Sequence, residues 1–158
     1  GVPVQAAGLR IVGWNDPAAQ RAGFGDPDPT AADLEQYRLG IEQWVARGEP
    51  ADVLVLHHYA PAEGLAGKAP VVLFGHDHRA RVEQREGSVL VDAGTTGAAG
   101  LRYLTSPTRP PFSAAVLQFS AGIAPRLEAV DLIHLRDPNG DFTVERTTVN
   151  GARARPGP

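Results

Sequence analysis

Four of the five histidines in this 158-residue chain occur as two pairs, and each pair follows a short apolar run. His57 and His58 follow "VLVL", whereas His76 and His78 follow "VVLFG". Imidazole nitrogens bind zinc, iron, manganese and related ions at about 2 Å, so paired histidines of this kind indicate a metal site. The fifth, His134 in "DLIHLRD", stands alone and is interpreted as a hydrogen-bonded residue of the core or its rim.

The apolar runs indicate where these histidines lie. Both are expected to form buried strands, and the carboxyl ends of adjacent parallel strands meet at the edge of the sheet where α/β proteins bind ligands. In an extended chain, His76 and His78 would project to one side and Asp77 to the other. We therefore expect His57, His76 and His78 to converge as metal ligands. For His58 three roles stay open: contact with substrate, support of a ligand from behind, or simple exposure.

A hydrolytic centre with two metal ions also needs carboxylate ligands. Asp16 in "GWNDP" and the pair Asp26 and Asp28 in "GDPDP" precede the first histidine pair. All three lie beside prolines, where aspartate commonly forms turns. We interpret them as turn residues and not as ligands.

Composition limits the other functional classes. The length is typical of one domain, and a formal net charge of −3 gives no basic surface for nucleic acid, so no nucleic-acid binding is predicted. The absence of cysteine excludes thiolate catalysis, disulfides and cysteine-type zinc sites. No segment has the length and apolarity of a membrane span, and no targeting segment is recognisable. Because the chain begins at Gly1 without methionine, we expect it to be part of a longer protein.

Alternating strands and helices predict an α/β protein with a mixed sheet. A strand is expected at 9–14, and Thr30 with Asp33 predicts a capping box at the start of a helix that ends near Gly48. Apolar runs predict further strands, with room for one short helix between the first two. These strands are expected at 53–56, 71–74 and in "SVLVDAG", "AAVLQFS", "RLEAVDLIHL" and "DFTVERTTV", with a tight turn at "DPNG" and a flexible tail at 151–158.

The sequence resembles the calcineurin-like metallophosphoesterases between about Leu9 and Thr148. That family combines Asp-x-His, Gly-Asp and Gly-Asn-His motifs with a histidine that closes an apolar strand and a final Gly-His-x-His. "VLVLHH" is similar to the fourth element and "LFGHDH" matches the fifth. "SVLVDAGTTGAAGLRYL" resembles the strand and glycine-rich loop that follow.

The resemblance implies a two-sheet sandwich flanked by helices and a pair of manganese, iron or zinc ions. His57 and His76 would bind one ion and His78 the other, and water bridging the ions would attack the phosphorus of a phosphoester substrate. Asp77 fills the variable position of the motif and inherits no role. Arg102, in the glycine-rich loop, is a candidate phosphate contact or a surface charge.

The first three family motifs are not present in these residues, and the resemblance places them before Gly1. We therefore expect residues 1–150 to be the C-terminal portion of a metallophosphoesterase domain that completes its site with the missing N-terminal half. The full-length protein would be a phosphoric ester hydrolase, whereas this chain alone would be inactive. Some bacterial relatives carry membrane segments ahead of this domain, so the full-length protein is expected to be cytoplasmic or membrane-anchored.

Two alternatives stay open. One is an amidohydrolase barrel, which also uses His-x-His but needs about 250 residues and places the pair on its first strand. The other is a metal-free, degenerate phosphoesterase-like domain that serves as a binding or interaction module. Metal analysis of the full-length protein would discriminate between the enzyme and the module.

Overall fold

The structure is a computed structural model, and it describes residues 1, 3–17, 28–48, 50–96, 112–135 and 140–150. Within these residues two helices and nine strands form. They are β1 (Pro3–Ala6), β2 (Leu9–Gly13), α1 (Ala31–Ala46), β3 (Val53–Val55), α2 (Tyr59–Gly64), β4 (Val71–Phe74), β5 (Arg81–Arg85), β6 (Ser88–Asp92), β7 (Phe112–Phe119), β8 (Leu127–Leu135) and β9 (Phe142–Thr148).

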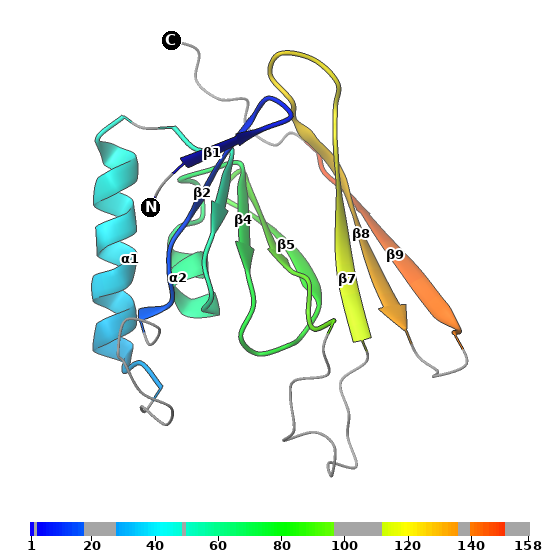
Figure 1. The fold of residues 1–158 in the computed structure, drawn as a ribbon, viewed down its shortest axis with the longest axis horizontal. Coiled ribbons are helices and arrows are strands. Elements are labelled where there is room, and N and C mark those ends of the chain that lie inside the picture. The colour runs from blue at the N-terminus through cyan, green and yellow to red at the C-terminus, as the bar shows by residue number, and fades with distance from the viewer. Residues whose placement is uncertain (2, 18–27, 49, 97–111, 136–139, 151–158) are drawn as a thin grey trace.

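The strands form two sheets. One has six strands in the order β1-β2-β3-β4-β6-β5, and the other has three in the order β7-β8-β9. The two helices cover one face of the larger sheet and the three-stranded sheet covers the other, which gives three layers (Figure 1). The expected mixed α/β architecture of two sheets with flanking helices is therefore confirmed.

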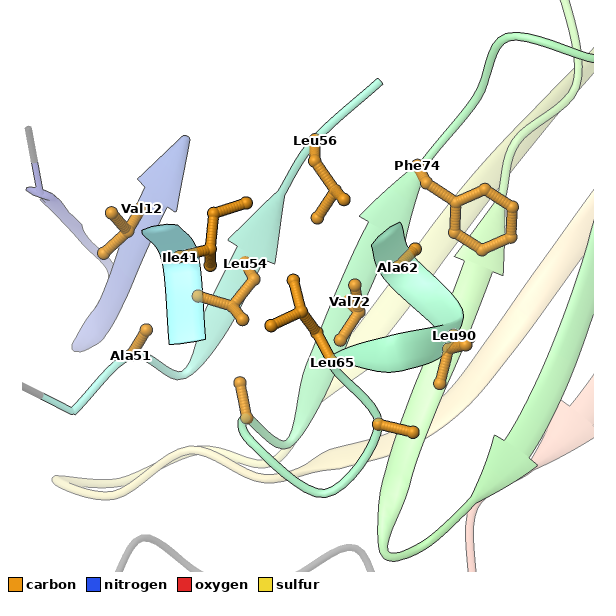
Figure 2. Packing of buried hydrophobic residues seen from close by; sticks show 12 residues of the cluster. Val12, Ile41, Ala51, Leu54, Leu56, Ala62, Leu65, Val72, Phe74 and Leu90 are labelled. Atoms are coloured by element: carbon orange, nitrogen blue, oxygen red, sulfur yellow. The ribbon is translucent and has the colours of Figure 1, made fainter. Parts of the chain in front are cut away.

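The alternation of side chains along β3 and β4 explains why both strands are apolar throughout. Leu54 and Val72 face the helices, where they pack with Ile41 and Leu65 (Figure 2). Val53 and Val71, one position earlier, instead pack toward the three-stranded sheet. A strand buried on both faces must be apolar at consecutive positions.

The central strands run parallel. β2 pairs with β3, β3 with β4, and β4 with β6, all in parallel register. Their carboxyl ends therefore lie along one edge of the sheet, as expected from the sequence. The outer strands β1 and β5 are antiparallel additions that the apolar pattern did not predict. All four residues of β1 are exposed, and β5 contains one apolar residue, Val82.

The long helix begins and ends as predicted. Thr30 accepts a hydrogen bond from the Asp33 amide, and the Asp33 carboxylate accepts one from the Thr30 amide, which completes the capping box. At the other end Arg47 caps the helix, and Gly48 follows with φ +84°. Glycine tolerates this left-handed conformation without a steric penalty.

The other predicted elements are confirmed where the structure describes them. The strands expected at 53–56 and 71–74 and in the later apolar segments are confirmed, as is the short helix between the first two. Most of the "DPNG" turn and the 151–158 tail lie outside the described residues. Within the described part, neither helix combines the length and apolarity that crossing a membrane requires.

Candidate metal centre

Three histidines meet at the carboxyl edge of the larger sheet. His57 follows β3, His58 begins α2, and His76 follows β4. One ring nitrogen of each lies within 4.8 Å of the corresponding nitrogens of the other two. His76 Nδ1 lies 3.1 Å from His57 Nε2, a hydrogen bond that needs one ring to donate and the other to accept.

His58 is the buried member of this cluster. Its exposure is 5%, whereas the His57 side chain is 45% exposed. His58 occupies the N-cap position of α2, yet its side chain makes no capping hydrogen bond. The ring instead packs against His76, with centroids 4.3 Å apart, and against His57 at 4.9 Å. Of the roles left open for His58, its burial excludes simple exposure.

A carboxylate lies beside two of these histidines. Asp16 Oδ1 lies 3.3 Å from His58 Nε2, and Asp16 Oδ2 lies 3.5 Å from His57 Nε2. The interpretation of Asp16 as a turn residue alone was therefore wrong. Asp16 follows β2, and β2 is the parallel neighbour of β3, so its position after an apolar strand was the available signal. The neighbouring Pro17 obscured that signal.

The Gly-His-x-His segment does not continue β4 as an extended strand. The strand ends at Phe74, and both His76 (φ +82°) and His78 (φ +58°) adopt left-handed conformations that side chains other than glycine rarely occupy. The assumed alternation of side chains along 76–78 was therefore wrong. His76 reaches the cluster, whereas His78 is not among its three members. Binding of a second ion by His78 stays a prediction.

The surroundings of His57 shift its pKa toward the form that binds metals. Burial lowers the pKa of His57, and the adjacent histidines lower it further, although the Asp16 carboxylate opposes them. A lowered pKa favours the neutral ring, and only the neutral ring binds metal. Burial also raises the pKa of the nearby Tyr37, and the Asp16 carboxylate raises it further. The Tyr37 hydroxyl donates a hydrogen bond to the Trp14 carbonyl oxygen at 3.3 Å.

Three of the contacts at this site have the spacing of ligands around one transition metal ion. Two donors bound tetrahedrally at about 2 Å from one ion lie about 3.3 Å apart. The nitrogen pair of His57 and His76 at 3.1 Å and the Asp16 contacts at 3.3 and 3.5 Å are close to that value. Three imidazoles and one carboxylate form a donor set that suits zinc, iron or manganese.

A groove opens beside the histidines. It has a volume of about 890 Å³, and His57 lies in its wall together with Ile11, Trp14, Tyr37 and Val55. The lining is thus mainly apolar and aromatic, with an imidazole at one point. Ligand sites commonly combine such a wall with a few polar groups. The candidate phosphate contact Arg102 lies outside the described residues.

Comparisons with known proteins returned structural similarity only. No family model matches the chain, and no curated protein matches it. Among solved structures, Vacuolar Protein Sorting 29 from Cryptosporidium parvum is similar over 94% of this chain and 56% of its own, with 18% identity and a TM-score of 0.42. Wild-type Vps29 from Entamoeba histolytica, complexed with Zn²⁺, has 16% identity and a TM-score of 0.44 over 94% of this chain and 60% of its own. This chain thus spans less than two thirds of either structure.

Proposed function

We propose that this chain binds a divalent transition metal ion through His57, His58 and His76, with Asp16 as the fourth donor. One observation carries the proposal: the ligand nitrogens of the three histidines, which come from two separate segments of the chain, all lie within 4.8 Å of one another. The lowered pKa of His57 favours its neutral imidazole. His78 is proposed to bind a second ion in the longer protein.

We propose further that this site serves phosphoester hydrolysis in a protein of the calcineurin-like metallophosphoesterase family. The support is the order of the motifs, in which a strand-closing histidine precedes Gly-His-x-His, together with parallel strands that bring both to one edge. Bound divalent ions would act as Lewis acids on a phosphoryl oxygen. The carboxylate ligands that such a centre needs beyond Asp16 are proposed to come from residues that precede this chain in the longer protein.

The residues described here have separate tasks in this proposal. His58 is the buried ligand and binds the ion from the protein interior. His57 and His76 form the solvent-facing side, where a phosphate group can approach. The groove beside His57 offers an apolar wall to the organic part of an ester. Asp16 supplies the negative charge that three neutral imidazoles lack.

Zinc titration of the metal-free chain tests metal binding. The chain is first dialysed against a chelator, and binding is then followed by competition with a chromophoric chelator. We expect one tight site in the parent chain and its loss in the His76→Ala variant. His134→Gln is the matched control, because His134 lies on β8 outside the cluster. Equal zinc affinity in the parent chain and His76→Ala would contradict the proposal.

Hydrolysis is tested separately on a longer version that includes the preceding residues. We expect that version, loaded with manganese or zinc, to hydrolyse a nitrophenyl phosphomonoester or phosphodiester, and the 158-residue chain to hydrolyse neither. An inactive, metal-loaded longer protein would separate metal binding from catalysis.

A metal-free interaction module is the second candidate function. It is favoured by the internal bonding of the cluster, since each ring already has a polar partner without any ion. Exposed apolar side chains on the three-stranded sheet also favour it, and they include Phe112, Val116, Phe142 and Val144. A longer protein that binds no metal and shows no hydrolysis would support this candidate.

A further inference from the structure

Asp77 lies between the two histidines of the Gly-His-x-His segment, and both oxygens of its carboxylate accept hydrogen bonds. The Arg79 amide donates to Oδ1 at 3.2 Å, and Arg81 Nη1 donates to Oδ2 at 2.7 Å. The carboxylate thus joins the middle of the loop to the first residue of β5. Charge-assisted hydrogen bonds of this kind are stronger than neutral ones.

The Arg81 guanidinium is itself held in place by packing. Its central carbon lies 4.5 Å from the ring centroid of Tyr59 and 5.1 Å from that of Phe74. The Arg81 backbone pairs with Asp92 in β6, and Nη2 lies 4.0 Å from the buried Asp92 carboxylate. With 25% of its side chain exposed, Arg81 is a fixed point of the folded sheet and not a mobile surface charge.

The loop needs such a fixed point because its backbone is strained. His76 and His78, on either side of Asp77, have φ values of +82° and +58°. Left-handed conformations of non-glycine residues persist only where the surroundings hold them. At its other end the loop is tied to the cluster, since the Gly75 amide donates to the His57 carbonyl at 3.0 Å.

We infer that Asp77 and Arg81 act together as a brace that positions His76 for metal binding. The inference rests on the proposed metal site, and it assigns a role to the variable position of the motif. Neither residue is a ligand, so both are positioning residues. Their effect passes through the loop: Arg81 holds Asp77, Asp77 holds the turn, and the turn directs the His76 ring toward His57 and His58.

Zinc affinity of the whole chain tests the brace. Groups that orient metal ligands typically change affinity about 10- to 100-fold when they are removed. We expect a loss of this size in Asp77→Asn and in Arg81→Gln. Because the two act as one unit, the double variant should lose no more than the worse single variant. Arg81→Lys, which keeps the charge but not the planar fork, should fall between the parent chain and Arg81→Gln.

Arg85→Gln is the matched control. Arg85 lies on the same strand and forms an ion pair with Glu63, away from the loop. Its replacement should leave zinc affinity unchanged. Losses in the double variant that equal the product of the two single losses would overturn the joint action. Unchanged affinity in both single variants would overturn the brace itself.

Hydrogen exchange in the metal-free chain gives a second readout that needs no zinc. Without the brace, the Gly75 amide should exchange faster, because the loop no longer holds its bond to His57. The Val89 amide, which donates to the Pro70 carbonyl at 2.9 Å, serves as an internal reference. If the parent chain bound no zinc, the proposed metal site would be wrong. The exchange rate of the Gly75 amide would then be the test of whether Asp77 and Arg81 hold the loop. Unchanged Gly75 exchange in Asp77→Asn and Arg81→Gln would overturn the brace.

Discussion

His76 Nδ1 lies 3.1 Å from His57 Nε2, although 19 residues separate the two histidines in the chain. The parallel register of β3 and β4 produces this contact. Val53 pairs with Val71 and Val55 with Leu73, so the residues that follow each strand arrive at the same edge. The register thus brings both segments to one edge of the sheet, and the loop after β4 then places the His76 ring beside His57.

Asp16 should matter to metal binding as much as the histidines do. We expect Asp16→Ala to weaken zinc binding at least about 10-fold, because even groups that only orient ligands contribute that much. Competition with a chromophoric chelator measures the change. Asp28→Ala is the control, since Asp28 is exposed, whereas Asp16 contacts both His57 and His58. Equal affinities for the two variants would remove Asp16 from the site.

The sequence predicted the part of the site that depends on buried strands. Continuous apolar runs require burial on both faces, and such strands are parallel and adjacent in α/β folds, so the convergence of His57 and His76 followed. Asp16 was missed because aspartate beside proline is usually a turn residue, and only the three-dimensional proximity of β2 and β3 shows otherwise.

The remaining differences also have physical causes. β1 and β5 are edge strands with little buried surface, and they form by backbone pairing to neighbours that are already in place. Their sequences therefore carry no apolar pattern. The left-handed conformations of His76 and His78 depend on tertiary contacts of the loop, because the weak preference of histidine for this region does not specify them in advance.

The buried carboxyl group of Asp92 should make stability depend on pH. Burial, followed by the nearby Asp77 carboxylate, raises the pKa of Asp92 to about 7, although the Gly94 amide and Arg81 oppose the shift. Because its pKa is higher in the folded state, Asp92 binds its proton more tightly in the folded chain than in the unfolded chain. The resulting stabilisation is complete below the unfolded-state pKa near 4 and is lost as pH rises toward 7. Between about pH 4 and pH 7, the free energy of unfolding of the parent chain should therefore fall relative to that of Asp92→Asn, by at most about 4 kcal/mol.

Urea denaturation of both proteins between pH 2 and pH 8 measures this difference. Asp131→Asn provides a control of opposite sign, because hydrogen bonding to Arg146 lowers the pKa of Asp131. The contribution of Asp131 is present above the unfolded-state pKa and is lost in acid as pH falls through the lowered value. A constant difference between the parent chain and Asp92→Asn across this range would show that the Asp92 carboxyl group titrates normally.

The core between the helices and the larger sheet should dominate stability. Leu54 is fully buried and packs with residues of both helices (Figure 2). Leu54→Ala should lower the free energy of unfolding by roughly 2–5 kcal/mol, from lost burial and the remaining cavity. Val116→Ala is the apolar control, since Val116 is 46% exposed and its truncation should cost under about 0.5 kcal/mol. Equal losses in urea denaturation would contradict the three-layer core.

His57 should give the metal-free chain a second pH dependence, near neutrality. Its folded-state pKa lies below the ordinary histidine value, chiefly because of burial, so the folded chain binds this proton less readily than the unfolded chain does. The corresponding stabilisation is therefore present above about pH 6.5 and is lost as pH falls through the lowered pKa. Between pH 7 and pH 5, the free energy of unfolding should fall more steeply in the parent chain than in His57→Gln.

Zinc added at 100 times its dissociation constant should raise the free energy of unfolding of the parent chain by about 2.7 kcal/mol at pH 7. This gain should shrink on acidification, as protons compete for the imidazoles. A zinc-induced gain that stays constant down to pH 5 would show that the ion is not held by these histidines.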